Sequence, residues 1–77
     1  MIIDPNSPDH PFEQLAAHLR EQIADGTITG LLPSFTALVA ETGLSLGTVQ
    51  RAINKLVDEG LVFKVQGRGV FVKRDEQ

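Results

Sequence analysis

The sequence contains no cysteine, and this absence narrows the classes of protein that it can encode. Disulfide bonds and thiolate metal sites are excluded, and the chain suits a reducing compartment. No apolar run approaches the roughly 20 residues that a membrane helix needs. The N-terminus also lacks the basic and then apolar regions of a secretion signal. We therefore expect a protein of the cytoplasm with no membrane partner.

A catalytic or metal-binding set of residues is also missing. His10 and His18 have no carboxylate partners at the spacing of metal ligands. No serine, histidine and acid occur in a supporting loop context, and the chain has little room for a closed pocket. The glycine-flanked residues 67–69 precede a strand rather than a helix, so they do not form a nucleotide-binding loop. The sequence indicates a protein that is not an enzyme and holds no cofactor or metal.

The composition is that of one ordinary globular domain. Apolar residues make up 42% of the 77 residues and charged residues 22%, which excludes intrinsic disorder. A chain of this size buries only about 60% of its unfolded surface, so its core must be compact.

The net charge of −3 is divided unevenly along the chain. Residues 1–33 carry five acidic side chains and one arginine. Residues 44–74 carry two acidic side chains and six basic ones, namely Arg51, Lys55, Lys64, Arg68, Lys73 and Arg74. This asymmetry suggests that the C-terminal half presents a surface to a polyanion.

The first segment with helical spacing begins near Pro11, a residue suited to the first position of a helix, and ends at Gly26. Its apolar stripe consists of Phe12, Leu15, Ala16, Leu19 and Ile23. Residues 1–10 hold two prolines and no periodic pattern, so we expect a flexible arm there. Residues 26–33 form a connector that has room for a short β-bridge.

Two further helices are predicted in the middle of the chain. One covers residues 35–42 after Ser34, and the other covers residues 46–59 after Ser45, because serine caps helix N-termini well. The apolar face of the second of these consists of Val49, Ala52, Ile53, Leu56 and Val57. The glycine-containing turn 42–45 joins the two helices in the manner of a helix-turn-helix.

The apolar period changes after residue 60. Residues 61–65 and 70–73 are β-prone runs separated by the sequence QGRG (66–69), whose glycines permit a hairpin turn. Residues 74–77 form a charged tail. Three helices followed by a two-stranded wing over residues 11–73 make a mainly α fold with a small β-hairpin, the winged helix-turn-helix.

Several stretches resemble the DNA-binding domain of the GntR family of bacterial transcription regulators. They are PFEQLAAHLREQIADG (11–26), LPS (32–34), LVAETGLSLGTVQRAINKLVDEGLV (38–62) and QGRGVFV (66–72). The resemblance implies a small regulator, a repressor, that binds double-stranded DNA. It places the recognition helix 46–59 in the major groove and the wing 66–69 in the minor groove or on phosphate.

The candidate DNA-binding residues follow from the resemblance and from side-chain chemistry. Gln50 pairs well with adenine and Arg51 with guanine or a phosphate, whereas Arg68 suits a phosphate or the minor groove. The alternatives are that these side chains only solvate their surfaces and that Ser45 is only a helix cap. The full set is Ser34, Thr36, Ser45, Gly47, Thr48, Gln50, Arg51, Lys55, Gly67, Arg68 and Gly69.

The sequence departs from the family pattern at three arginines. Thr36, Leu46 and Gln50 stand where the family usually has arginine, and the connector is about two residues shorter than usual. Apolar residues stand at positions where the family is usually polar and outward-facing: Phe35, Leu46, Phe63 and Val65. An exposed cluster of these would suit a protein partner. The alternative function is therefore a protein–protein interaction module with weak or no DNA binding.

The family's usual second domain, which senses a ligand and dimerises, does not follow the wing in this sequence. We therefore expect a monomer or a weak homodimer in solution that pairs on DNA. Symmetric repressors bind two half-sites about 10 bp apart, so pairing would give each copy one half-site.

Overall fold

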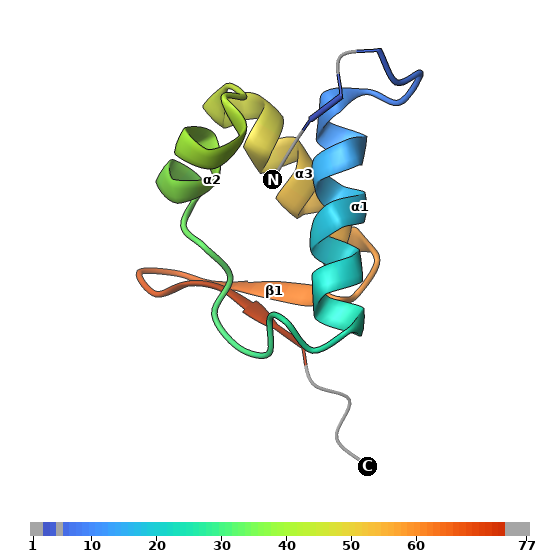
Figure 1. Cartoon of the computed structure of the whole chain (residues 1–77). Coiled ribbons are helices and arrows are strands. Elements are labelled where there is room, and N and C mark those ends of the chain that lie inside the picture. Colours follow the sequence, from blue (N-terminus) through green and yellow to red (C-terminus); the bar gives the residue numbers. More distant parts are fainter. Residues whose placement is uncertain (1–2, 5, 74–77) are drawn as a thin grey trace.

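The computed structural model describes residues 3–4 and 6–73 and contains three helices followed by a two-stranded hairpin (Figure 1). The elements are α1 (Pro11–Ala24), α2 (Phe35–Thr42), α3 (Leu46–Asp58), β1 (Val62–Val65) and β2 (Gly69–Val72). The predicted winged helix-turn-helix is confirmed, with element ends within two residues of those expected. The predicted tail 74–77 lies outside the described residues.

Both predicted serine caps form. Ser34 Oγ accepts a hydrogen bond of 3.0 Å from the backbone N–H of Ala37 at the start of α2. Ser45 Oγ accepts one of 3.2 Å from the N–H of Thr48 at the start of α3. Helix α1 has no side-chain cap and begins at Pro11, whose missing N–H needs no partner there.

The turn between α2 and α3 depends on one left-handed glycine. Gly43 has φ 74° and donates its N–H to the carbonyl of Val39 at 2.9 Å, which ends α2. Thr42 reinforces the turn, because its hydroxyl donates to the carbonyl of Leu38 at 2.7 Å and accepts from the N–H of Leu44 at 3.1 Å. These bonds fix the direction in which α3 leaves α2.

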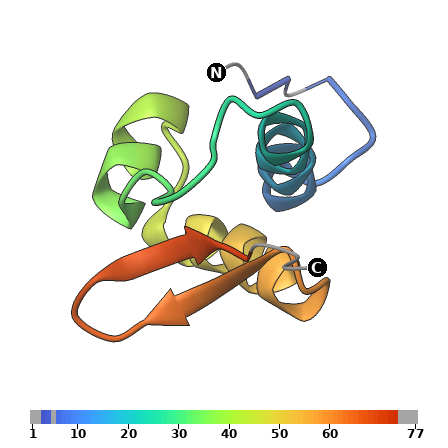
Figure 2. The same cartoon turned by 90° about the horizontal axis from the view of Figure 1, so that it is seen from below.

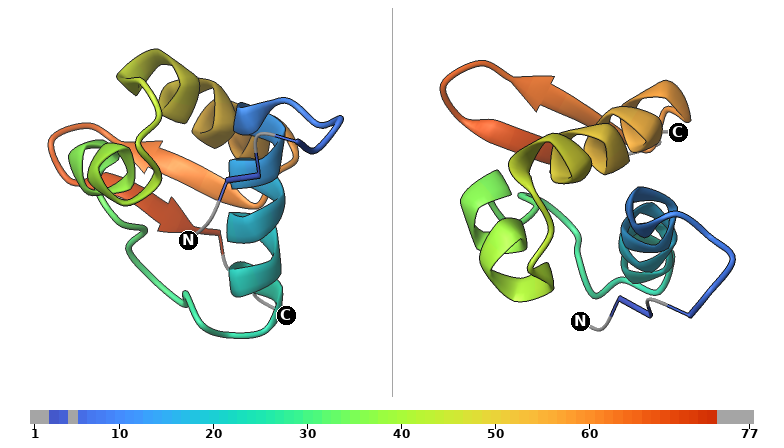
Figure 3. Two further views of the ribbon diagram at one scale, coloured as in Figure 1. Left: turned by 45° about the horizontal axis from the view of Figure 1, so that its top comes forward. Right: turned by 90° about the horizontal axis from the view of Figure 1, so that it is seen from above.

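The core surrounds the apolar face of α3. Helices α1 and α2 and strand β1 all pack against α3, and the hairpin lies alongside that helix (Figures 2 and 3). The buried side chains are Leu15, Ala16, Leu19, Leu32, Leu38, Val49, Ala52, Ile53, Leu56, Val62 and Val70. Among the described residues, no helix is long and apolar enough to cross a membrane.

The connector between α1 and α2 pairs with the base of the wing. The hairpin is antiparallel, with the register Val62↔Val72, Phe63↔Phe71, Lys64↔Val70 and Val65↔Gly69. Leu31 forms an isolated bridge with Phe71, and the N–H of Leu32 donates to the carbonyl of Val70 at 2.8 Å. The short β-bridge predicted for the connector, residues 26–33, is therefore present. It anchors the wing from a segment some 40 residues away along the chain.

The described part of the N-terminal arm is tied to α1. The side-chain amide of Gln14 donates to the carbonyls of Asp4 and Asp9 at 3.0 Å each, and its oxygen accepts from the N–H of Asp4 at 2.8 Å. Ile3 packs against the core. The flexibility expected of residues 1–10 stays a prediction.

The turn at Gly43 leads to a test of stability. An alanine at this left-handed position should lower the free energy of unfolding by about 1–2 kcal/mol, because its Cβ meets the following carbonyl. Gly47 in the first turn of α3 is the matched control, since open space surrounds the Cβ that alanine would add. Gly47→Ala should raise stability by up to about 1 kcal/mol. Urea unfolding followed by circular dichroism measures both changes, and equal effects would contradict the described turn.

Candidate nucleic-acid interface

Helix α3 presents a polar face opposite its buried one. Val49, Ala52 and Ile53 are fully buried, so the helical period turns Gln50 and Arg51 outward, where both are exposed. Further along the helix, the candidate Lys55 is half-buried and Asn54 and Asp58 are exposed. Two of the three candidates on this helix beyond its first turn, Gln50 and Arg51, are therefore exposed.

The start of α3 combines a helix cap with a pair of hydroxyl groups. The hydroxyls of Ser45 and Thr48 lie 2.9 Å apart, in addition to the capping bond. Ser45 is exposed, Thr48 is half-buried, and nothing lies within 4 Å of the Cβ position of Gly47. The first N–H groups of a helix lack intrahelical partners, so this end favours an anion. The capping role of Ser45 is confirmed, and a phosphate contact stays a prediction.

Arg51 lies against an aromatic ring of α1. Its guanidinium carbon is 4.4 Å from the centroid of the Phe12 ring, and the ring of His10 stacks on Phe12 at 6.0 Å. A hollow of about 160 Å³ at this place is lined by Thr48 and Arg51 from α3 and by His10, Pro11 and Phe12. Sequence reasoning assigned Phe12 only to the apolar stripe and missed this contact.

The tip of the wing is built on two glycines. Gly67 and Gly69 have φ 79° and 122°, and the N–H of Arg68 between them donates to the carbonyl of Val65 at 3.0 Å. A Cβ added at Gly69 would lie 3.0 Å from Leu31 Cδ1, so a side chain there would press on the connector. Arg68 is exposed at the turn.

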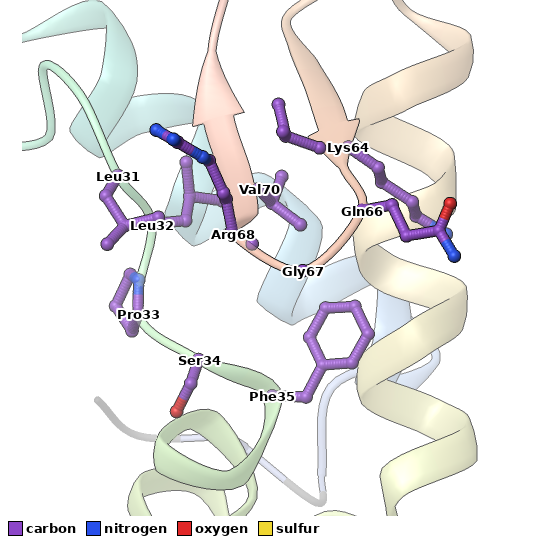
Figure 4. A pocket seen from close by; sticks show the side chains of 12 residues that line it. Leu31, Leu32, Pro33, Ser34, Phe35, Lys64, Gln66, Gly67, Arg68 and Val70 are labelled. Carbon is purple, nitrogen blue, oxygen red and sulfur yellow. The ribbon is translucent and has the colours of Figure 1, made fainter.

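A groove of about 670 Å³ separates the wing tip from the start of α2 (Figure 4). The connector, the first residue of α2 and the turn of the hairpin line it, and the ring of Phe35 faces the turn at Gly67. Ser34 and the three candidate residues of the wing border this one groove. Thr36 is exposed in the first turn of α2 and does not line the groove.

The four apolar residues expected on the surface divide into two pairs. Phe35 and Val65 are half-buried, which corrects their expected exposure: Phe35 packs against the core, and Val65 pairs with Gly69 at the wing tip. Leu46 is 50% exposed and Phe63 is 44% exposed. Phe63 lies on β1 of the wing, whereas Leu46 is the first residue of α3, so the two belong to different elements.

Two polar contacts hold α3 to its neighbours. Lys64 Nζ on β1 donates to Asn54 Oδ1, which ties the wing to the polar face of α3. Arg20 of α1 binds both carboxylate oxygens of Glu59, with Nε–Oε1 2.9 Å and Nη2–Oε2 2.7 Å. The sequence analysis counted Lys64 only among the basic residues of the C-terminal half, and it did not predict the Arg20–Glu59 pair.

Hydrogen bonds shift the pKa values of three charged side chains. The hydrogen bond from Arg20 lowers the pKa of Glu59, and the same bond raises the pKa of Arg20. Hydrogen bonds from the Thr27 hydroxyl and N–H lower the pKa of Asp25. Within the described part of the chain, no three histidine or acidic residues gather in a way that would hold a metal ion.

The family model described as "Bacterial regulatory proteins, gntR family" matches residues 11–72, the span of the three helices and the wing. The chain belongs to the GntR family. A curated relative is the mannosyl-D-glycerate transport/metabolism system repressor MngR of Escherichia coli (strain K12). It is 38% identical over 66 residues, which make up 83% of this chain and 28% of that protein. The chain spans less than a third of the length of the curated relatives it matches.

Solved GntR structures have the same fold. YtrA from Sulfolobus acidocaldarius, a GntR-family transcription factor, superposes with a TM-score of 0.86 and 37% identity, covering 96% of this chain and 80% of that one. The DNA-binding domain of AraR in complex with operator ORE1 gives a TM-score of 0.85 and 26% identity, covering 95% and 98%. The expected family and fold are confirmed, and the individual DNA contacts remain predictions.

The Arg20–Glu59 pair predicts a dependence of stability on pH. Because the pKa of Glu59 is lowered on folding, the unfolded chain binds more protons in acid, and the pair stabilises fully only above the unfolded pKa of about 4.3. Glu59→Gln should lower the free energy of unfolding at pH 6 by at most about 1 kcal/mol, since both side chains are about one-third exposed. The difference should vanish as the pH falls through the lowered pKa.

Urea unfolding of the wild type and Glu59→Gln between pH 6 and pH 3 measures this difference. The control is the same pair of proteins in an Arg20→Met background, where the substitution at Glu59 should have little effect at any pH. A difference that is as large at pH 3 as at pH 6 would show that Glu59 stabilises through packing rather than charge.

Proposed function

We propose that the chain is a transcription regulator that binds double-stranded DNA, with α3 in the major groove and the wing tip on the minor groove or on phosphate. The observation that carries this proposal is that Gln50 and Arg51 on α3 and Arg68 on the wing are all exposed, on elements held in place by the core and the connector. The structural relative determined with operator DNA supports it.

The two elements would make different kinds of contact. A helix fits the major groove, where glutamine and arginine pair with base edges. Arg68 carries one positive charge at the end of a short glycine-flanked turn, which suits a phosphate or a narrow minor groove. Ser34, Thr36, Ser45, Gly47, Thr48, Lys55, Gly67 and Gly69 complete the proposed contact surface.

Repression is the proposed outcome of binding. A domain seated on promoter DNA blocks the binding of other proteins there, and the relative from Escherichia coli is named as a repressor. We infer that two copies bind two half-sites about 10 bp apart, as symmetric regulators do. The proposed site of action is the bacterial chromosome in the cytoplasm. Repression by DNA binding requires no catalytic step.

A second candidate function is a protein-interaction module. The observation that favours it is the exposure of Leu46 and Phe63, at 50% and 44%. Exposed apolar side chains suit a protein partner best when they form a continuous patch. These two lie on different elements, at the start of α3 and on β1. The DNA-binding proposal is the stronger one because exposed arginines lie on both α3 and the wing and a structural relative was determined with operator DNA.

Substitutions at Arg68 and Gln50 test the division of roles. Arg68→Ala should weaken binding to all duplexes similarly and reduce the slope of log affinity against log salt by about one unit, because one phosphate contact is lost. Gln50→Ala should cost about 1–3 kcal/mol at the preferred site and relax the choice of one base pair. Gln22→Ala, a change of the same neutral amide on α1 outside the proposed contact surface, is the control and should change neither.

Fluorescence anisotropy with a duplex selected from a random pool, and with the unselected pool, measures these effects at several salt concentrations. If Arg68→Ala altered base preference and Gln50→Ala did not, the division of roles would be wrong. If the wild type bound no duplex, the DNA-binding proposal would fail.

Leu46→Arg tests the departure at the start of α3. A cation at this half-exposed position should strengthen non-specific DNA binding and steepen its salt dependence by about one unit. Leu46→Gln is the matched control, because it removes the apolar side chain without adding charge, and it should leave the salt slope unchanged. Unchanged DNA affinity in Leu46→Arg, together with loss of self-association in both variants, would favour the interaction module.

A further inference from the structure

Arg51 is held by a ring rather than by a carboxylate. The guanidinium carbon lies 4.4 Å from the centroid of Phe12. Within residues 3–4 and 6–73, the ion pair found is Arg20–Glu59, so no described carboxylate lies within salt-bridge distance of Arg51. The contact joins the first turn of α1 to the exposed face of α3.

This kind of contact orients an arginine without using up its hydrogen-bonding groups. A guanidinium is attracted to the face of an aromatic ring by the quadrupole of the ring. Its five N–H donors lie in the plane of the group, so an aromatic face leaves them free for base edges or phosphate. A carboxylate would accept from two of those donors and neutralise the charge. The arrangement therefore suits an arginine that has to bind something else.

Phe12 itself is fixed in place. It is half-buried and packs against the core, and His10 stacks on it at 6.0 Å with an angle of 16° between the rings. Its neighbour Gln14 holds the described arm residues by three hydrogen bonds. A ring that is anchored on one element can therefore restrict the rotamers of a flexible side chain on another.

We propose that Phe12 is a positioning residue that orders Arg51 before DNA arrives. This inference rests on the proposed function and extends it, because it assigns a role in DNA recognition to a residue of α1. Immobilising a long, flexible side chain on binding costs conformational entropy. If Arg51 is already ordered in the free protein, DNA binding does not incur this cost. An exposed cation–π contact of this kind corresponds to about a two- to fivefold change in affinity.

A double-mutant cycle tests the proposal. Phe12→Leu keeps an apolar side chain on the core but removes the ring, and it should weaken binding to the selected duplex about two- to fivefold. The same change in an Arg51→Ala background should have no effect, because there is no guanidinium to orient. Phe12→Tyr keeps the ring face and should bind within twofold of the wild type. Thermal unfolding identifies any loss of fold in each variant.

The free protein gives a readout that does not depend on DNA. The Arg51 Nε–Hε NMR signal should carry an upfield ring-current shift in the wild type and in Phe12→Tyr, and should lose it in Phe12→Leu. Equal weakening of binding by Phe12→Leu in the wild-type and Arg51→Ala backgrounds would overturn the proposal. Tighter binding by Phe12→Leu would also overturn it, because it would mean that the ring keeps Arg51 away from DNA.

The failure of this inference is distinct from that of the proposed function. If the wild type binds the duplex and Phe12→Leu matches it, only the role of Phe12 is overturned. If the wild type binds no duplex, both fall, although the arginine signal still reports whether the ring contact exists.

Discussion

The burial of the apolar face of α3 is the interaction on which the rest of the structure depends. Val49, Ala52, Ile53 and Leu56 are fully buried, and α1, α2 and β1 each pack against this helix. No other element contacts all three, so α3 is both the centre of the core and the helix proposed to enter DNA. Because one whole face of α3 is buried, the core sets the direction in which its polar face points relative to the wing.

The charge distribution shows how an acidic chain can present a basic surface. The net charge is −3, yet Glu59 near the end of α3 is paired with Arg20 of α1. The exposed side chains of Arg51 and Arg68 lie on α3 and on the wing, the two elements that we propose contact DNA. Fields near a surface depend on the nearest charges more than on the total, because salt screens beyond about 10 Å. The sign of the whole chain is therefore a poor guide to its partner.

The features predicted from sequence are those set by neighbouring residues. The caps at Ser34 and Ser45 and the left-handed Gly43 follow from chemistry within four residues, so the element boundaries could be predicted closely. The contacts of Arg20 with Glu59 and of Arg51 with Phe12 each span 39 residues. An apolar stripe shows which side of a helix is buried, but it does not show which charged side chain will lie at the edge of that stripe.

The pairing of the connector with β2 has a consequence for chain length. Leu31, 58% exposed, and Leu32, 3% exposed, point to opposite sides of this small sheet, which the Leu32–Val70 bond and the bond from the Val72 N–H to the Gly30 carbonyl hold in register. A shift of this pairing by a single residue would exchange the two sides and expose the buried leucine. Residues 25–30 form no helix or strand, so a change of length there can be absorbed by the loop. The pairing therefore fixes the wing to Leu31 and Leu32 and leaves the length of the preceding loop unconstrained.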